Sequence, residues 1–104
     1  MYKVVYTKQA RKDLDNIKYS ALKYKVKTFI EIIKENPYQI PPPYEKLSGD
    51  MSEFYSRRIN IQHRLVYQIF EEEKTVKILS MWSHYENIKK ILEEDEEYGG
   101  ILKP

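Results

Sequence analysis

The residues best suited to do chemistry in this chain are a glutamate, an arginine and a histidine–tyrosine pair. Glu45 lies in a proline-rich segment, Arg64 opens a predicted strand, and His84-Tyr85 close a later one. A carboxylate, an imidazole and guanidinium groups that meet in one cleft can cleave RNA without a metal. The carboxylate takes the proton of a 2′-hydroxyl, the imidazolium protonates the leaving 5′-oxygen, and arginine stabilises the charge of the phosphorane. From residue types alone, RNA cleavage is one of several candidate reactions.

Further arginines and tyrosines surround these four residues in the sequence. Arg57 and Arg58 are adjacent on a predicted strand, where arginine forms surface ion pairs about as often as it binds phosphate. Tyrosine rings can stack on bases, and those expected near the cleft are Tyr44, Tyr55 and Tyr85. Two other tyrosines, Tyr19 and Tyr24, are expected to pack in the core.

Composition narrows the classes of protein that fit. The 104 residues are enough for one small domain, 41% hydrophobic and 33% charged. The absence of cysteine excludes a disulfide framework, a thiol nucleophile and a thiolate metal site, and two histidines are too few for a histidine-rich one. No metal or cofactor is therefore expected. No stretch resembles a signal peptide or a membrane span, so the expected location is the cytoplasm.

The charge is distributed unevenly although the net charge is only +2. Residues 1–70 carry 13 Lys and Arg against 7 Asp and Glu, whereas residues 71–104 carry 5 against 9. A basic front portion can attract a polyanion, and an acidic end would oppose that attraction. Ordinary helical proteins also carry lysine-rich surfaces, so this asymmetry is weak evidence by itself.

The first half of the chain reads as a strand followed by two helices. Residues 2–6 are β-branched and aromatic, and Thr7 can cap a helix in which Ala10, Leu14 and Ile17 recur at helical spacing while Asp13 faces out. Ser20 can cap a second helix with one apolar stripe, formed by Leu22, Val26, Phe29, Ile30 and Ile33. Pro37 ends it and opens a stiff loop over residues 37–50 that contains four of the five prolines.

The second half reads as three strands, 54–61, 64–70 and 75–82, joined by turns at 62–63 and 71–74. The predicted fold is α+β with the order β-α-α-β-β-β: two helices pack on one face of a small, mainly antiparallel sheet and leave the other face available. Short turns bring the start of one strand beside the end of its neighbour, so Arg64 and His84 are expected at one end of the sheet. A short helix is expected from Glu86, with Ile88, Ile91 and Leu92 on one side.

Three ordered blocks carry a resemblance to a known family. They are Phe54-Tyr55-Ser56-Arg57-Arg58-Ile59, His63-Arg64-Leu65-Val66-Tyr67 and His84-Tyr85. Together they resemble the YoeB/Txe family of the RelE toxin superfamily, over residues 1–85. The resemblance implies a RelE-like toxin domain over residues 1–85, followed by an acidic extension over 86–104 that the family's short members lack.

The resemblance implies an activity, partners and residue roles. Family members are the toxins of type II toxin–antitoxin systems, metal-independent endoribonucleases that cleave mRNA in the ribosomal A site and are silenced by a YefM-like antitoxin; a homodimer is compatible with the family. It implies Glu45 as the base, His84 as the acid, Arg64 and Arg58 as phosphate ligands, and Tyr85 as the residue that positions the nucleotide. Arg57, Lys46 and Tyr55 complete the expected RNA-binding set.

The chain departs from the family pattern at a few positions. The family reads Pro-Glu-Pro-Leu-Lys where this chain has Tyr44-Glu45-Lys46-Leu47-Ser48, so Lys46 is the only lysine near the base. Glu53 replaces a glycine, and Tyr55 replaces a tryptophan. Two alternatives stay open: a ParE-like toxin that inhibits DNA gyrase without a nuclease site, and a non-catalytic RNA- or ribosome-binding protein. Neither requires Glu45, Arg64 and His84 together, and the fold does not choose among them.

Overall fold

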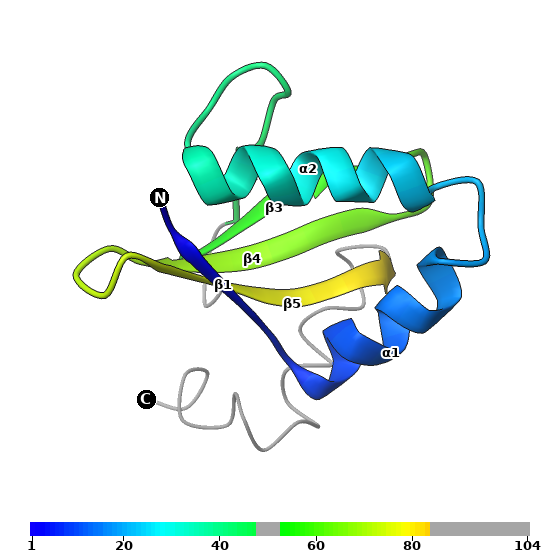
Figure 1. The fold of residues 1–104 in the computed structure, drawn as a ribbon. Helices are drawn as coiled ribbons and strands as arrows, with labels where there is room; N and C mark the ends of the chain where they lie inside the picture. The colour runs from blue at the N-terminus through cyan, green and yellow to red at the C-terminus, as the bar shows by residue number, and fades with distance from the viewer. Residues whose placement is uncertain (48–52, 84–104) are drawn as a thin grey trace.

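The computed structural model describes residues 1–47 and 53–83, which form two helices and a five-stranded mixed sheet (Figure 1). The sheet order is β1-β5-β4-β3-β2, with β1 parallel to β5 and the remaining pairs antiparallel. The predicted α+β fold is therefore confirmed, with one addition, the two-residue strand β2. The helix predicted from Glu86 lies outside the described residues. The elements are β1 (Lys3–Tyr6), α1 (Lys8–Ile17), α2 (Lys23–Glu35), β2 (Glu45–Lys46), β3 (Phe54–Arg58), β4 (Arg64–Phe70) and β5 (Thr75–Ser83).

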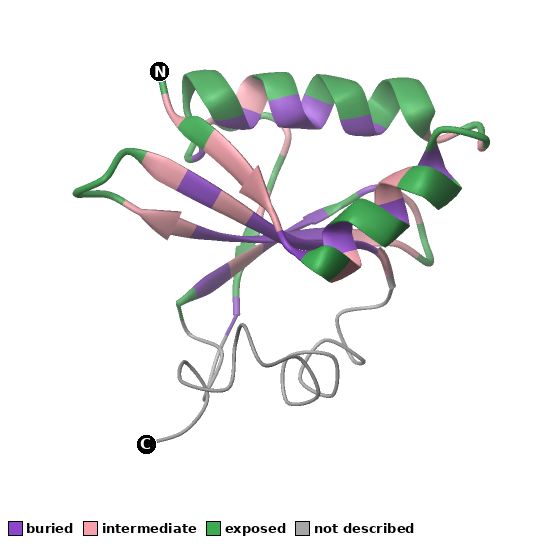
Figure 2. Cartoon of the chain, turned by 60° about the horizontal axis from the view of Figure 1, so that its bottom comes forward, coloured by how far each residue is buried: buried purple, intermediate pink, exposed green. Residues whose placement is uncertain are grey.

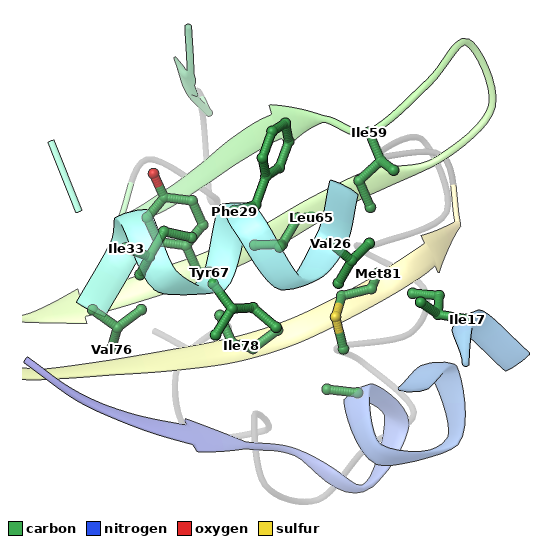
Figure 3. Close-up of a cluster of buried hydrophobic side chains, with 12 residues drawn as sticks. Ile17, Val26, Phe29, Ile33, Ile59, Leu65, Tyr67, Val76, Ile78 and Met81 are labelled. Atoms are coloured by element: carbon green, nitrogen blue, oxygen red, sulfur yellow. The ribbon is translucent and has the colours of Figure 1, made fainter. Parts of the chain in front are cut away.

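The main core lies between the helices and the sheet. Helix α2 buries the stripe predicted from its sequence, including Val26, Phe29 and Ile33, against Tyr67 and other residues of β4 and β5 (Figure 3). Figure 2 shows the exposed residues of α2 on its outer side and the buried ones toward the sheet. No helix in residues 1–47 or 53–83 is long and apolar enough to span a membrane.

Helix α1 begins as predicted, but one of its polar residues faces the protein interior. The Thr7 hydroxyl accepts a hydrogen bond from the Ala10 amide at 2.9 Å, as an N-cap should. Asp13, predicted to face out, is buried, and its Oδ2 accepts the Met81 amide of β5 at 2.8 Å. That prediction was wrong because the carboxylate accepts a backbone N–H of β5, at a point where the pairing of β4 with β5 is irregular.

Asp13 contacts the part of β5 in which the pairing with β4 is irregular. Two register shifts separate the pairs Tyr67↔Ile78, Val66↔Ser80 and Arg64↔Ser83. At each shift β5 has one residue more than the facing segment of β4. The extra residue changes the direction of the side chains that follow it. Together the two shifts place Ser83 opposite Arg64. This is the end of the sheet at which the sequence predicted that Arg64 and His84 would meet.

Several local predictions need correction. Helix α2 begins at Lys23, and the Ser20 hydroxyl accepts the Leu22 amide within the turn that precedes the helix. Tyr19 and Tyr24 are 84% and 74% exposed rather than packed, because Tyr19 lies in the turn after α1 and Tyr24 is not part of the buried stripe of α2. Strand β3 ends at Arg58 rather than at residue 61, because the Asn60 side chain accepts two amides of the following turn.

The face of the sheet opposite the helices is not free along its whole length. The pairs Phe54↔Gln68 and Val66↔Ser80 lie on that face, since Tyr55 and Tyr67 point to the helices. All four residues of these pairs are buried. The prediction that this face is available therefore holds only toward the end of β3 and the start of β4, where Arg58 is exposed and Arg64 is half-buried.

An exposed carboxylate ties three distant segments together near the β4–β5 turn. Glu71 accepts hydrogen bonds from the Lys74 ammonium at 2.5 Å, the Tyr2 hydroxyl at 2.8 Å and the Tyr38 hydroxyl at 2.9 Å. These donors, Lys74 first, lower the pKa of Glu71 to about 2. Tyr38 belongs to the proline-rich loop, so Glu71 links that loop to the N-terminus and to the turn.

We predict that Glu71→Gln changes how stability depends on pH. Because the folded-state pKa lies below the unfolded-state value, the ionised carboxylate stabilises the fold fully above about pH 4.5, and this contribution is lost as the pH falls toward about 2. The wild type should therefore melt at a higher temperature than Glu71→Gln at pH 7, and the gap should narrow at pH 3. Glu72→Gln, in the same turn, is the control. A gap that stays constant between pH 7 and pH 3 would contradict the role of the carboxylate.

Candidate functional site

A pocket of about 270 Å³ lies beside β2, the end of β3 and the start of β4, on the sheet face opposite the helices. The strand register explains how it forms, since Glu45 pairs with Ser56 and Arg58 pairs with Arg64 across adjacent strands. Side chains of paired residues lie on the same face, and residues two apart on one strand share a face. The pocket is lined by Pro43, Tyr44, Glu45, Ser56, Arg58 and Arg64. Three predicted site residues, Glu45, Arg58 and Arg64, are thus brought together.

The two arginines of the pocket lie directly opposite each other. Like charges at paired positions of a sheet destabilise it, so an Arg58↔Arg64 pair has a cost that an anion bound between the side chains would offset. Among the described residues, neither arginine forms an ion pair with a carboxylate. One terminal nitrogen of Arg64 donates to the carbonyls of Asn60 at 2.8 Å and Ile61 at 3.2 Å, which anchors that side chain on the turn.

Glu45 reaches the pocket because strand β2 pairs with β3. The pairing extends to the Leu47 amide, which donates to the Phe54 carbonyl at 2.8 Å. Glu45 is exposed, and its neighbours on the pocket face are Ser56 and the arginines. An exposed carboxylate that lines the same pocket as two arginines can act as a base while the arginines bind an anion.

Three expected RNA-binding residues are not at the pocket. Lys46 pairs with Tyr55, and both point to the helix side of the sheet, because successive residues of a strand alternate between faces. Tyr55 stacks on Tyr67, with ring centroids 5.7 Å apart. Arg57 also points to that side, is 0% exposed, and donates through Nε to the Tyr67 hydroxyl at 3.1 Å. The structure therefore places an exposed guanidinium at Arg58 and a buried one at Arg57.

The remaining predicted residues, His84 and Tyr85, lie outside the described residues. Strand β5 is described to Ser83, whose backbone pairs with Arg64. Ser56 and Pro43 are pocket residues that sequence reasoning did not identify. The period of two along β3 indicates Ser56, since it shares a face with Arg58. In residues 1–47 and 53–83, no group of three or more His, Asp or Glu residues could hold a metal ion.

Comparison with known proteins assigns the chain to a family. The family model described as "YoeB-like toxin of bacterial type II toxin-antitoxin system" matches residues 6–85. The chain belongs to the YoeB-like toxins. No protein of curated function matches the sequence of this YoeB-like toxin.

Solved structures agree with this assignment. A YoeB/ParE toxin from Agrobacterium tumefaciens is 27% identical with a TM-score of 0.73, and the match covers 80% of this chain and 99% of the other. A YoeB-YefM complex from Staphylococcus aureus is 28% identical with a TM-score of 0.69 and covers 82% and 99%. A YoeB dimer from the same organism is 30% identical with a TM-score of 0.68 and covers 81% and 98%. The sequence-based prediction of a YoeB-family toxin is thereby confirmed.

Proposed function

We propose that this toxin is an endoribonuclease that cleaves mRNA on the ribosome, in the A site, without a metal ion. The observation that carries the proposal is the pocket in which Glu45 lies beside Arg58 and Arg64. A binding-only toxin needs no exposed carboxylate next to paired arginines. The membership of the chain in the YoeB-like family supports the same reaction.

In the proposed mechanism each group has one task. The Glu45 carboxylate takes the proton of the 2′-hydroxyl, and the 2′-oxygen attacks the adjacent phosphorus. The bond from phosphorus to the 5′-oxygen breaks, and His84 supplies the proton that this oxygen needs. Arg58 and Arg64 balance the negative charge that builds on the phosphorane oxygens, and Tyr85 positions the nucleotide. The products are a 2′,3′-cyclic phosphate and a 5′-hydroxyl.

Primer extension on an mRNA in a translation extract tests the activity. We expect toxin-dependent cuts at fixed positions within codons, and we expect these cuts to vanish when ribosomes are removed. Cuts on naked mRNA at the same rate would contradict ribosome dependence. Intact mRNA together with inhibited supercoiling by gyrase would favour the ParE-like alternative, and intact mRNA with the toxin bound to ribosomes would favour the non-catalytic one.

We further propose a YefM-like antitoxin as the partner, because a similar toxin was solved as a YoeB-YefM complex. An acidic segment of that partner would cover Arg58 and Arg64, which have no carboxylate partner among the described residues. We also propose that the toxin can form a homodimer, because another similar toxin was solved as a dimer. The proposed location of the toxin and its partner is the cytoplasm.

The antitoxin proposal predicts a gain in stability. A partner that binds only the folded toxin should stabilise it by about 2.7 kcal/mol when free partner is present at about 100 times its Kd. The check is thermal melting with and without the antitoxin that we expect to be encoded beside this toxin, followed by the cleavage assay on the mixture. An unchanged melting temperature with undiminished cleavage would rule that partner out.

We also propose that residues 1–85 form the toxin domain and residues 86–104 an acidic extension. The family model ends at residue 85, and the extension includes five consecutive acidic residues, 93–97. A chain that ends at Tyr85 should therefore keep its fold and cleavage activity. An unfolded truncation would assign the extension to the domain.

A further inference from the structure

We infer that Arg57 is a positioning residue for Glu45: its guanidinium anchors the proline-rich loop and does not bind RNA phosphate. The inference rests on the proposed function only in taking Glu45 as the base. It concerns the helix side of the sheet, where Arg57 lies directly beneath the loop that leads into β2. The neighbouring arginine, Arg58, points to the pocket on the opposite side.

The first observation is that Arg57 is a buried cation held by neutral groups. It is 0% exposed and forms no ion pair with a carboxylate among the described residues. One terminal nitrogen donates to the carbonyls of Pro37 and Gln39, each at 3.0 Å, and the other donates to the carbonyl of Pro42. A buried charge is tolerated only when its donors are satisfied, and here loop carbonyls satisfy them.

The second observation is that the loop needs these donors. Proline has no N–H, so the segment from Pro37 to Pro43 has few backbone donors of its own. The Tyr67 hydroxyl adds one more donor, to the Pro37 carbonyl at 3.0 Å. Burial raises the pKa of Tyr67 to about 12, so this hydroxyl keeps its proton at neutral pH. Arg57 and Tyr67 together thus replace the backbone hydrogen bonds that a proline-rich loop lacks.

The third observation connects the anchor to Glu45. The Arg57 guanidinium lies 5.1 Å from the centre of the Tyr44 ring, a distance at which a cation and a ring attract each other. The edge of that ring also meets Tyr55, at 5.6 Å between centroids. Tyr44 is the residue before Glu45, and Glu45 pairs with Ser56, the residue before Arg57. The anchor therefore holds the chain that leads into Glu45, and the pairing with Ser56 holds Glu45 itself at the edge of β3.

The test compares two adjacent arginines in the full-length toxin. In Arg57→Met, kcat for mRNA cleavage should fall about 10²-fold, since displacing a catalytic group by about 1 Å costs that much, while KM stays near the wild-type value. The salt dependence of binding to a short RNA should also stay unchanged. In Arg58→Gln, loss of a phosphate contact should reduce the slope of log affinity against log salt by about one.

Hydrogen exchange of the amides in residues 38–46 gives a readout that does not depend on activity. These amides should exchange faster in Arg57→Met and at the wild-type rate in Arg58→Gln. Arg57→Lys keeps the charge but lacks the planar guanidinium with its several donors, so its loop amides should exchange as fast as those of Arg57→Met. If Arg57→Met does not fold, Tyr67→Phe takes its place, with faster loop exchange and a smaller drop in kcat expected.

Two results would overturn the inference. Arg57→Met with a reduced salt slope and a protected loop would make Arg57 a phosphate ligand. A loosened loop with unchanged kcat would show that the anchor does not position Glu45. If the wild-type toxin does not cleave RNA, the proposed function fails, whereas the exchange experiment still decides whether Arg57 anchors the loop.

Discussion

Replacing Glu45 by glutamine is expected to lower kcat for mRNA cleavage by about 10²–10⁴-fold, the usual contribution of a positioned proton-transfer group. Glutamine keeps the size and polarity of the side chain but cannot accept the proton of the 2′-hydroxyl. Glu45 is exposed, so the free energy of unfolding should change by less than about 0.5 kcal/mol. His84→Gln should lower kcat by a similar factor, because it removes the proton donor.

Single-turnover cleavage of ribosome-bound mRNA measures this effect separately from binding. Glu72→Gln, an exposed carboxylate in the β4–β5 turn, is the matched control and should cleave at the wild-type rate. Cleavage by Glu45→Gln at the rate of the control would remove Glu45 from the mechanism. Loss of activity in an unfolded variant is recognised by circular dichroism and would not count as support.

The second large effect is expected for Arg64→Ala. Removal of a guanidinium that stabilises the phosphorane should lower kcat by about 10²–10³-fold. It should also reduce the salt slope of RNA binding by about one, since one phosphate contact disappears. Arg64→Lys keeps the charge but loses the bidentate hydrogen bonding of the guanidinium. Compared with Arg64→Ala, it should restore the salt slope of RNA binding more fully than it restores kcat.

Arg64 has a structural contact that the experiment must separate from its chemical role. Its terminal nitrogen donates to the carbonyls of Asn60 and Ile61. The turn between β3 and β4 should therefore loosen somewhat in Arg64→Ala, which thermal melting detects. A variant that melts early but cleaves at the wild-type rate would identify Arg64 as a turn anchor only.

Much of the fold follows from patterns that are local in the sequence. The stripe of α2 has helical spacing, Pro37 cannot continue a helix, and Thr7 offers the hydroxyl that an N-cap needs. Strand β4 was predicted with its observed bounds, Arg64–Phe70, because β-branched and aromatic residues are bounded by polar turns. These features depend on neighbours within a few residues.

The features that the sequence did not predict depend on contacts between distant segments. In the sequence Asp13 has the features of a surface carboxylate, and only the folded structure brings the Met81 amide of β5 next to it. Strand β2 is too short to have a pattern of its own and exists because β3 offers an edge. Tyr19 and Tyr24 carry an apolar ring but lie outside the stripe that faces the sheet.

The strand pattern alone separates the two adjacent arginines. Neighbouring residues of a strand point to opposite faces, so Arg57 and Arg58 cannot both reach one pocket. The same rule separates Glu45 from Lys46 once β2 is recognised as a strand. Which member of each pair faces the pocket required the register with β4, and that register is a property of the folded sheet.

The most direct test of the account uses an mRNA with a single 2′-deoxy substitution at a nucleotide after which the toxin cuts. In the proposed mechanism the 2′-oxygen, activated by Glu45, is the nucleophile. We predict that the substituted mRNA stays intact at that position and that the unmodified mRNA yields a 2′,3′-cyclic phosphate and a 5′-hydroxyl. Cleavage of the 2′-deoxy site at the wild-type rate would show that another nucleophile attacks the phosphorus and would contradict the account.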